Sequence, residues 1–129
     1  MNIYFCGSMT LDHSKKKFYA KIINYLGNYG RVLNKFVGED FVDISPNETF
    51  KRDTHNLDSA DILIADISIA SLGVGFELGY FSKLNKPILL IYDEEKLLPS
   101  SLVRGIPNAI VKSYNNFDEV KIVIDKFIK

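Results

Sequence analysis

The stretch "DILIADISIASLGVGFELGY", residues 61–80, joins a strand-like segment to a helix-like one. Its opening, "DILIADI", is short, apolar and rich in β-branched residues, which is typical of a strand buried on both faces of a parallel sheet. Gly73 and Gly75 then mark the start of a helix, and an acid, Glu77, follows between two apolar residues. A strand that passes through such a turn into a helix indicates an α/β fold and draws attention to Glu77.

The segments on either side repeat this alternation of strand and helix. Short β-branched or aromatic runs predict strands, and apolar residues at helical spacing predict helices. We expect strands at residues 2–7, 31–34, 61–67, 86–92 and 108–114, helices at 12–29, 47–59, 73–84 and 117–128, and loops over most of 36–48 and 93–101. The pattern predicts an α/β, flavodoxin-like three-layer sandwich, with a five-stranded parallel sheet in the order 2-1-3-4-5 and a single domain over residues 1–129.

The composition limits the classes of function. The chain has 129 residues, of which 47% are hydrophobic and 25% charged, values typical of one globular domain. Its 16 basic and 16 acidic residues give a formal net charge of zero, which argues against binding to a nucleic acid polymer. The single cysteine and the lack of a basic leader or a membrane-length apolar run predict a cytoplasmic protein with no membrane partner.

Two turns are expected at the carboxyl ends of neighbouring strands, where open α/β sheets bind their ligands. These turns are "CGSMT" (residues 6–10) and "SLGVGFE" (residues 71–77), and neither carries a G-x-G-x-x-G or Walker fingerprint. The glycines at 73 and 75, with the hydroxyls of Ser8 and Ser71, could hold an anion at the start of a helix. Ser71 could equally serve only as the cap of that helix.

Glu77 falls in the first turn of its expected helix, at the edge of the sheet where ligands bind. The helix dipole favours an acid there by about 0.3–1 kcal/mol, which requires no catalytic role. Asp53 and Asp66 are candidate partners, because two carboxylates on either side of a sugar can cleave a glycosidic bond. Each of these acids, taken alone, also fits a helix cap or a solvated surface position.

Several motifs together resemble a known enzyme family. They are "IYFCGSM" at residues 3–9, Asp53 seven residues before "ADILIADIS", "SLGVGFELG" at residues 71–79 and "SSLVRG" at residues 100–105. This combination is similar to the 2′-deoxynucleoside 5′-phosphate N-hydrolases, within the nucleoside 2-deoxyribosyltransferase superfamily. The resemblance implies that residues 1–129 form one nucleoside deoxyribosyltransferase-like domain with the sheet order expected above.

The resemblance also implies a role for each residue that matches a family motif. Glu77 matches the nucleophile that attacks C1′ of the deoxyribose, and Asp53 matches the acid that protonates the departing base. Tyr4 matches a tyrosine that positions the nucleophile and crowds the 2′ side of the sugar. The groups that match the 5′-phosphate site are Gly7, Ser8, Ser71, Gly73 and Gly75, with Ser100 reaching the site of the other subunit in a homodimer.

The implied activity is hydrolysis of 2′-deoxynucleoside 5′-monophosphates to a free base and 2-deoxyribose 5-phosphate, without a metal or organic cofactor. One departure concerns Thr10, which stands where the family has an arginine near the phosphate, so phosphate recognition must come from other groups. Two alternatives stay open, a deoxyribosyltransferase that acts on free nucleosides and a non-catalytic nucleotide-binding module. Retention of all three catalytic-type residues favours an enzyme over the binding module.

Overall fold

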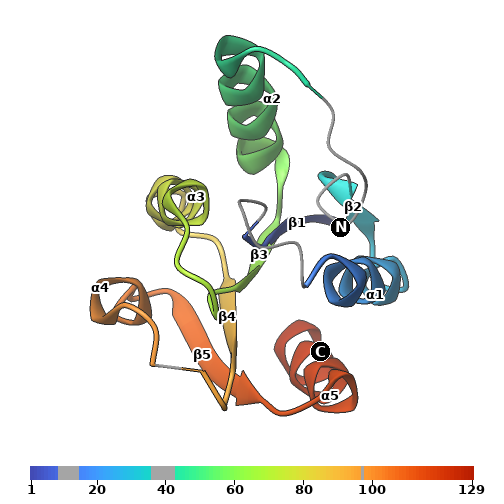
Figure 1. Ribbon diagram of the computed structural model, residues 1–129. Helices are drawn as coiled ribbons and strands as arrows, with labels where there is room; N and C mark the ends of the chain where they lie inside the picture. Colours follow the sequence, from blue (N-terminus) through green and yellow to red (C-terminus); the bar gives the residue numbers. More distant parts are fainter. Residues whose placement is uncertain (9–14, 36–42, 97) are drawn as a thin grey trace.

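The computed structural model describes residues 1–8, 15–35, 43–96 and 98–129. Within these residues one sheet of five parallel strands has the order β2-β1-β3-β4-β5 (Figure 1). Its strands are β1 (Asn2–Cys6), β2 (Arg31–Val32), β3 (Ile62–Asp66), β4 (Ile88–Asp93) and β5 (Ala109–Tyr114). The predicted class and strand order are confirmed.

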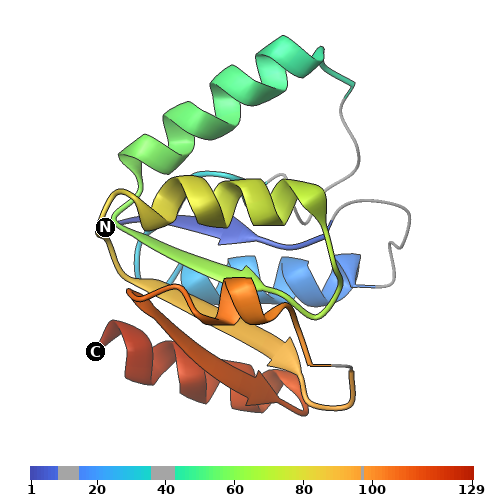
Figure 2. The same ribbon diagram turned by 90° about the vertical axis from the view of Figure 1, so that its left-hand side faces the viewer.

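Helices cover both faces of the sheet and make a three-layer sandwich (Figures 1 and 2). One face carries α1 (Lys16–Leu26) and α5 (Phe117–Ile128). The other face carries α2 (Pro46–Ser59), α3 (Leu72–Ser82) and the short α4 (Ser101–Arg104). The sequence pattern predicted all of these helices except α4, which is a single turn and too short to show a helical period. Among the described residues, no helix is long and apolar enough to span a membrane.

The central strand β1 sends its side chains alternately into the two layers. Ile3 and Phe5 belong to the core under α1 and α5, whereas Tyr4 and Cys6 belong to the core under α2 and α3. All of these side chains are buried, because a central parallel strand is covered on both faces. The alternation therefore places Tyr4 and Cys6 beneath the helix that carries Glu77.

The edge strand β2 is shorter than the sequence predicts. It ends at Val32, and a side chain continues the pairing two residues later. Asn34 is fully buried, its Oδ1 accepts a 2.9 Å hydrogen bond from the Phe5 amide, and its Nδ2 donates to the Phe5 carbonyl. The amide side chain satisfies the backbone groups that another strand residue would have paired, so a tight turn replaces the last two residues of the strand predicted over 31–34.

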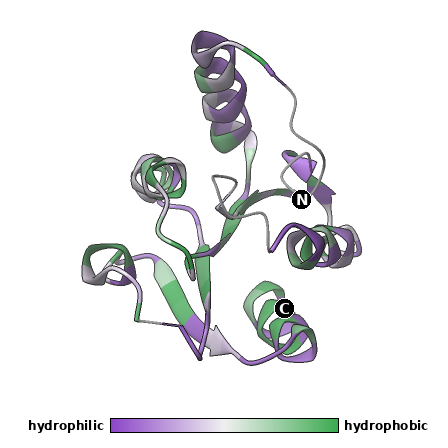
Figure 3. Cartoon of the chain, viewed as in Figure 1, coloured by the Kyte–Doolittle hydropathy of each residue, from purple (hydrophilic) through white to green (hydrophobic). Residues whose placement is uncertain are grey.

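The helix α2 projects beyond the sheet. Ser45 caps it by accepting a 3.2 Å hydrogen bond from the Glu48 amide, and Pro46 occupies its first turn. Leu57, near its end, is the one buried residue among those that the structure describes on this helix, and most of its length is hydrophilic (Figure 3). Its first turns therefore stand over α3 rather than on the sheet (Figure 2).

Candidate active site

The turns after β1 and β3 lie side by side, because Cys6 pairs with Ala65 at the carboxyl ends of these strands. Gly7 follows β1, and a Cβ at this position would lie 2.5 Å from the Tyr19 ring. Only glycine fits there, so Gly7 has a packing reason for its identity in addition to any contact with a ligand. Ser8, the next residue, is buried at the same edge of the sheet.

The start of α3 combines a helix cap with open space. The Ser71 hydroxyl accepts a 3.3 Å hydrogen bond from the Val74 amide, and the Gly75 amide donates at 3.0 Å to the Ser71 carbonyl. The amides of Leu72 and Gly73 precede this first intrahelical bond and are the ones that a helix presents to an anion. A Cβ at Gly75 would meet nothing within 4 Å, so the glycine is not required by packing and leaves room above the helix.

Glu77 lies half-buried on α3, with two side chains of β1 beneath it. It is the sixth residue of the helix and not in the first turn as the sequence analysis predicted, because α3 already begins at Leu72. The Tyr4 hydroxyl donates a hydrogen bond to Glu77 Oε2, and the Cys6 side chain also hydrogen-bonds this carboxyl group. Burial raises the pKa of Tyr4 above its usual range, as does the nearby Glu77. The same two causes raise the pKa of Cys6, so both groups stay protonated as donors and the thiol is no nucleophile.

The pKa of the Glu77 carboxyl is raised to about 7. Burial is the main cause, and the negative charge of Asp53 adds to it. The hydrogen bond from Tyr4 is the largest opposing effect, followed by Cys6 and the positive charge of Arg52. A carboxyl group that changes protonation state near neutral pH, at the ligand-binding edge of the sheet, has the properties of a catalytic group.

A cavity of about 380 Å³ lies between α2 and α3, within the size range of small-molecule sites. Asp53 and Glu77 both line it, one from each helix. The Arg52 Nε lies 2.9 Å from Asp53 Oδ1, so the second carboxylate belongs to an ion pair. The full lining comprises Ile44, Pro46, Thr49, Phe50, Asp53, Gly73, Phe76 and Glu77.

The structure thus brings Asp53, Gly73 and Glu77 to one cavity, with Tyr4 bonded to Glu77. Ser100 lies elsewhere, at the N-cap of α4, where its hydroxyl accepts a 3.5 Å hydrogen bond from the Val103 amide. Thr10 falls outside the described residues.

Two residues of the cavity, Phe50 and Phe76, were not singled out by the sequence analysis. The signal that could have found Phe50 is its position one helical turn before Asp53 on a helix with few other apolar residues.

Asp66, the other candidate partner of Glu77, belongs to a separate buried cluster. Its Oδ1 accepts hydrogen bonds from the Ser68 amide at 2.9 Å and the Ser68 hydroxyl at 2.5 Å. Its Oδ2 accepts from the Tyr114 hydroxyl at 2.8 Å and lies 3.3 Å from the Lys15 ammonium. The Ser68 hydroxyl oxygen also accepts a 2.8 Å hydrogen bond from the Asp93 amide, so the cluster joins the ends of β3, β4 and β5.

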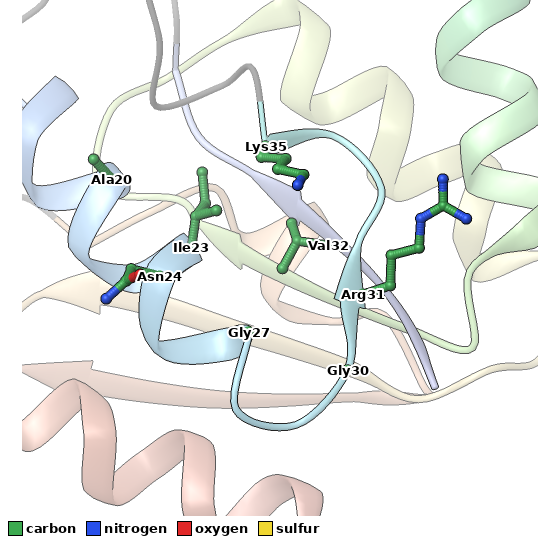
Figure 4. A pocket seen from close by; sticks show the side chains of 8 residues that line it. All are labelled: Ala20, Ile23, Asn24, Gly27, Gly30, Arg31, Val32 and Lys35. Carbon is green, nitrogen blue, oxygen red and sulfur yellow. The ribbon is translucent and has the colours of Figure 1, made fainter.

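A second cavity, of about 350 Å³, lies between α1 and β2 (Figure 4). Arg31 and Lys35 line it, and the Arg31 side chain extends away from the residues of α1. Its described lining holds no carboxylate, so it lacks the groups that glycosidic cleavage requires. Over the described ranges as a whole, no group of three metal-binding side chains occurs.

Comparisons with known proteins identify the family of the chain. Residues 3–126 match the protein family described as nucleoside 2-deoxyribosyltransferase. A Thermofilum pendens protein, named as a candidate 2′-deoxynucleoside 5′-phosphate N-hydrolase 1, is 35% identical over 99% of this chain and 95% of its own. The 5-hydroxymethyl-dUMP N-hydrolase of Danio rerio is 32% identical over 100% of this chain and 96% of its own.

Among solved structures, a CMP N-glycosidase of Clostridium botulinum superimposes with a TM-score of 0.79 at 23% identity. The match covers 98% of this chain and 99% of the other. A 2-deoxyribosyltransferase of Bacillus psychrosaccharolyticus superimposes with a TM-score of 0.67 at 19% identity, covering 94% of this chain and 90% of the other. At these identities the two structures support the fold alone.

Proposed function

The chain belongs to the nucleoside 2-deoxyribosyltransferase family and is an N-glycosidase, and from this premise we propose that it hydrolyses 2′-deoxynucleoside 5′-monophosphates. The observation that carries the proposal is the cavity that Asp53 and Glu77 line together, with Tyr4 hydrogen-bonded to Glu77. Relatives that cover nearly the whole chain and are named for nucleotide N-hydrolysis support it. The products are a free base and 2-deoxyribose 5-phosphate.

In the proposed reaction Glu77 is the nucleophile and Asp53 is the proton donor. The two carboxyl groups share one proton, and in the reacting form Asp53 carries it while Glu77 is ionised. The Glu77 carboxylate attacks C1′ while the C1′–N bond breaks, and Asp53 gives the proton to the departing base. Water then attacks C1′ of the ester, its proton returns to Asp53, and Glu77 leaves as a carboxylate. The Tyr4 hydroxyl holds Glu77 in the orientation for attack and lies on the 2′ side of the sugar, where it favours a 2′-deoxy substrate.

Phosphate recognition is proposed to come from the two turns at the carboxyl ends of β1 and β3. Ser8 and Ser71 supply hydroxyls, and the start of α3 supplies the Gly73 amide and a positive dipole. Gly75 contributes space rather than a donor, because its amide is already bonded to Ser71, and Gly7 allows the turn after β1 to pack against Tyr19. Each charge-assisted hydrogen bond contributes about 1.5–3 kcal/mol, so two are enough for a preference of more than tenfold for the phosphate.

The test is to incubate the purified protein with dCMP, deoxycytidine and CMP, with and without adenine as an acceptor base. We expect cytosine and 2-deoxyribose 5-phosphate from dCMP, with kcat/KM at least about tenfold above deoxycytidine. Faster turnover of deoxycytidine, with transfer of its sugar to adenine, would favour the deoxyribosyltransferase alternative that the family includes. If the protein releases cytosine from none of the three substrates, the nucleotide-binding module is the alternative that stays open.

We further propose that the protein is a cytoplasmic homodimer in which Ser100 completes the partner's phosphate site. Support comes from exposed leucines near both segments, since Leu72 is 95% exposed beside Ser71 and Leu102 is 85% exposed beside Ser100. A subunit interface buries exposed apolar side chains of this kind, and a two-fold pair is the commonest oligomer. A second copy would cover both leucines.

Mixing two inactive chains tests this arrangement. We expect a heterodimer of Glu77→Gln and Ser100→Ala chains to recover phosphate-dependent activity, because one of its sites then has Glu77 from one chain and Ser100 from the other. Sedimentation should give a dimer for the wild type and a monomer for Leu102→Lys, whose new charge cannot be buried. Absence of recovery, with heterodimers shown to form, would place Ser100 outside the partner's site.

A further inference from the structure

Two phenylalanines line the same cavity as the two carboxylates and are unusually open to solvent. Phe50 on α2 is 57% exposed and Phe76 on α3 is 49% exposed. Their ring centroids lie 6.0 Å apart, with the ring planes tilted by 52°. Tyr80 extends this row from the next turn of α3, with its centroid 6.1 Å from that of Phe76. Exposed aromatic side chains that line a cavity mark a surface for an apolar part of a ligand.

The helices present each aromatic ring next to one carboxylate. Phe50 precedes Asp53 by one helical turn, so both lie on the face of α2 that borders the cavity. Phe76 is adjacent to Glu77, and it shares the cavity with Gly73, which lies one turn earlier on α3. A molecule that occupies this cavity therefore has both rings and both carboxylates in its walls.

We propose that Phe50 and Phe76 form the platform on which the nucleobase of the substrate stacks, an inference that rests on the proposed N-glycosidase reaction. The base is joined to C1′ by the bond that breaks, so it must lie beside Glu77 and within reach of Asp53. The apolar planar part of the nucleotide is its base, and it matches the chemistry of the two rings. The sugar and phosphate then extend toward the start of α3.

The spacing of the rings determines how the base binds. To insert a base between two rings, the ring centroids must lie about 7 Å apart, because each stacking contact takes about 3.5 Å. The centroids of Phe50 and Phe76 lie only 6.0 Å apart. The base therefore rests on the exposed faces of the pair. The hydroxyl of Tyr80 is bonded at 2.8 Å to Asp58 Oδ1, which holds the outer end of the row in place.

A platform of this kind recognises a flat ring and not a particular base. Phenylalanine has no hydrogen-bond donor or acceptor, so stacking affects every base and depends on the area of its face. Loss of one stacking ring should reduce kcat/KM by about fivefold to 150-fold. The loss should be at least as large for dAMP as for dCMP, because adenine has the larger face.

The experiment compares Phe50→Ala, Phe50→Leu and Phe50→Trp in the full chain. For each variant we would measure kcat/KM on dCMP and dAMP, the dissociation constants of free cytosine and adenine, and the sedimentation coefficient. We expect the order Trp ≥ Phe > Leu > Ala in both kcat/KM and base affinity, with no change in oligomeric state. Ile122→Ala on α5, also half-exposed at 54%, is the matched control and should behave as the wild type.

Three results would overturn the stacking proposal. These are Phe50→Ala within twofold of the wild type, Phe50→Leu equal to the wild type, or a loss of activity that accompanies dissociation into monomers. The last would assign Phe50 to a subunit contact. If the wild type cleaves no nucleotide, the proposed hydrolase fails, and the affinities for free cytosine and adenine still decide whether Phe50 binds a base.

Discussion

Asp66 and Glu77 are two carboxyl groups at the same edge of the sheet, but they differ in burial and in their bonding partners. Asp66 is fully buried and is bonded to Ser68 and Tyr114, with the Lys15 ammonium 3.3 Å away. Glu77 has hydrogen bonds from Tyr4 and Cys6, borders an open cavity and has no described cation as close as the one at Asp66. A buried acid with a full set of partners stabilises a fold.

An acid that is buried without a close cation costs stability when it ionises, and it becomes available to a substrate. The raised pKa of Glu77, about 7, is the physical mark of that difference. The comparison therefore predicts a structural role for Asp66 and a reactive role for Glu77.

The largest expected effect is the loss of base release in Glu77→Gln. Glutamine keeps the size and polarity of the side chain but cannot form the bond to C1′, so kcat on dCMP should fall by about a thousandfold or more. The measurement is cytosine release by chromatography, with circular dichroism to show an intact fold. A well-folded Glu77→Gln protein with wild-type turnover would contradict the assignment.

Asp53→Asn should lose about a hundredfold to ten-thousandfold in kcat, the usual contribution of a positioned proton donor. The loss should be smaller for a substrate with a better leaving group, because such a base departs without protonation. Comparing dCMP with a nitrophenyl 2-deoxyriboside 5-phosphate provides this test. An equal loss on both substrates would mean that Asp53 positions the substrate and does not donate a proton.

Asp66→Asn should instead reduce stability. Removing one partner of a buried ion pair costs about 3 kcal/mol, and the Lys15 ammonium and the Tyr114 hydroxyl would both lose a charged acceptor. Urea unfolding at pH 7 measures the change. At temperatures where the variant is folded, its kcat should stay within about tenfold of the wild type, whereas Glu77→Gln should lose far more.

Tyr4→Phe should move the acid limb of the pH–rate profile upward. The Tyr4 hydrogen bond favours the ionised form of Glu77 and lowers its pKa, so its removal raises that pKa above the present value of about 7. Loss of one charge-assisted hydrogen bond should raise the pKa of Glu77, and with it the limb, by roughly one to two pH units. The limb of kcat/KM for dCMP reports the shift, and an unchanged limb with reduced kcat would leave Tyr4 a contact to the sugar only.

The sequence allowed the sheet order and most helix positions to be predicted, because residues 61–67 form a short apolar run and the apolar residues of α1 and α5 recur at helical spacing. It did not reveal that β2 stops at Val32, since the Asn34 side chain that replaces the strand pairs with Phe5, which is distant in sequence. The single turn of α4 was missed for lack of a repeat.

For the site, pattern and resemblance drew attention to Asp53 and Glu77, and both line the cavity. The residue pattern alone could not separate Asp53 from Asp66 as the partner of Glu77, because that choice depends on which helix overhangs the cavity, whereas the resemblance pointed to Asp53. The roles of the aromatic ring of Phe50 and of the bond from Cys6 to Glu77 also depend on three-dimensional packing.

The stability of Glu77→Gln as a function of pH tests most directly whether Glu77 is a strained, reactive acid. Its pKa is raised in the folded state from 4.5 to about 7, so its protonated form stabilises the fold below pH 4.5, and this contribution is lost as pH rises through 7. Glutamine stays neutral, so at pH 8 the variant should be more stable than the wild type by roughly 2 kcal/mol, and at pH 4.5 nearly equal to it. Urea unfolding at both pH values provides the measurement. A variant that is less stable than the wild type at pH 8 would show that Glu77, like Asp66, serves the fold.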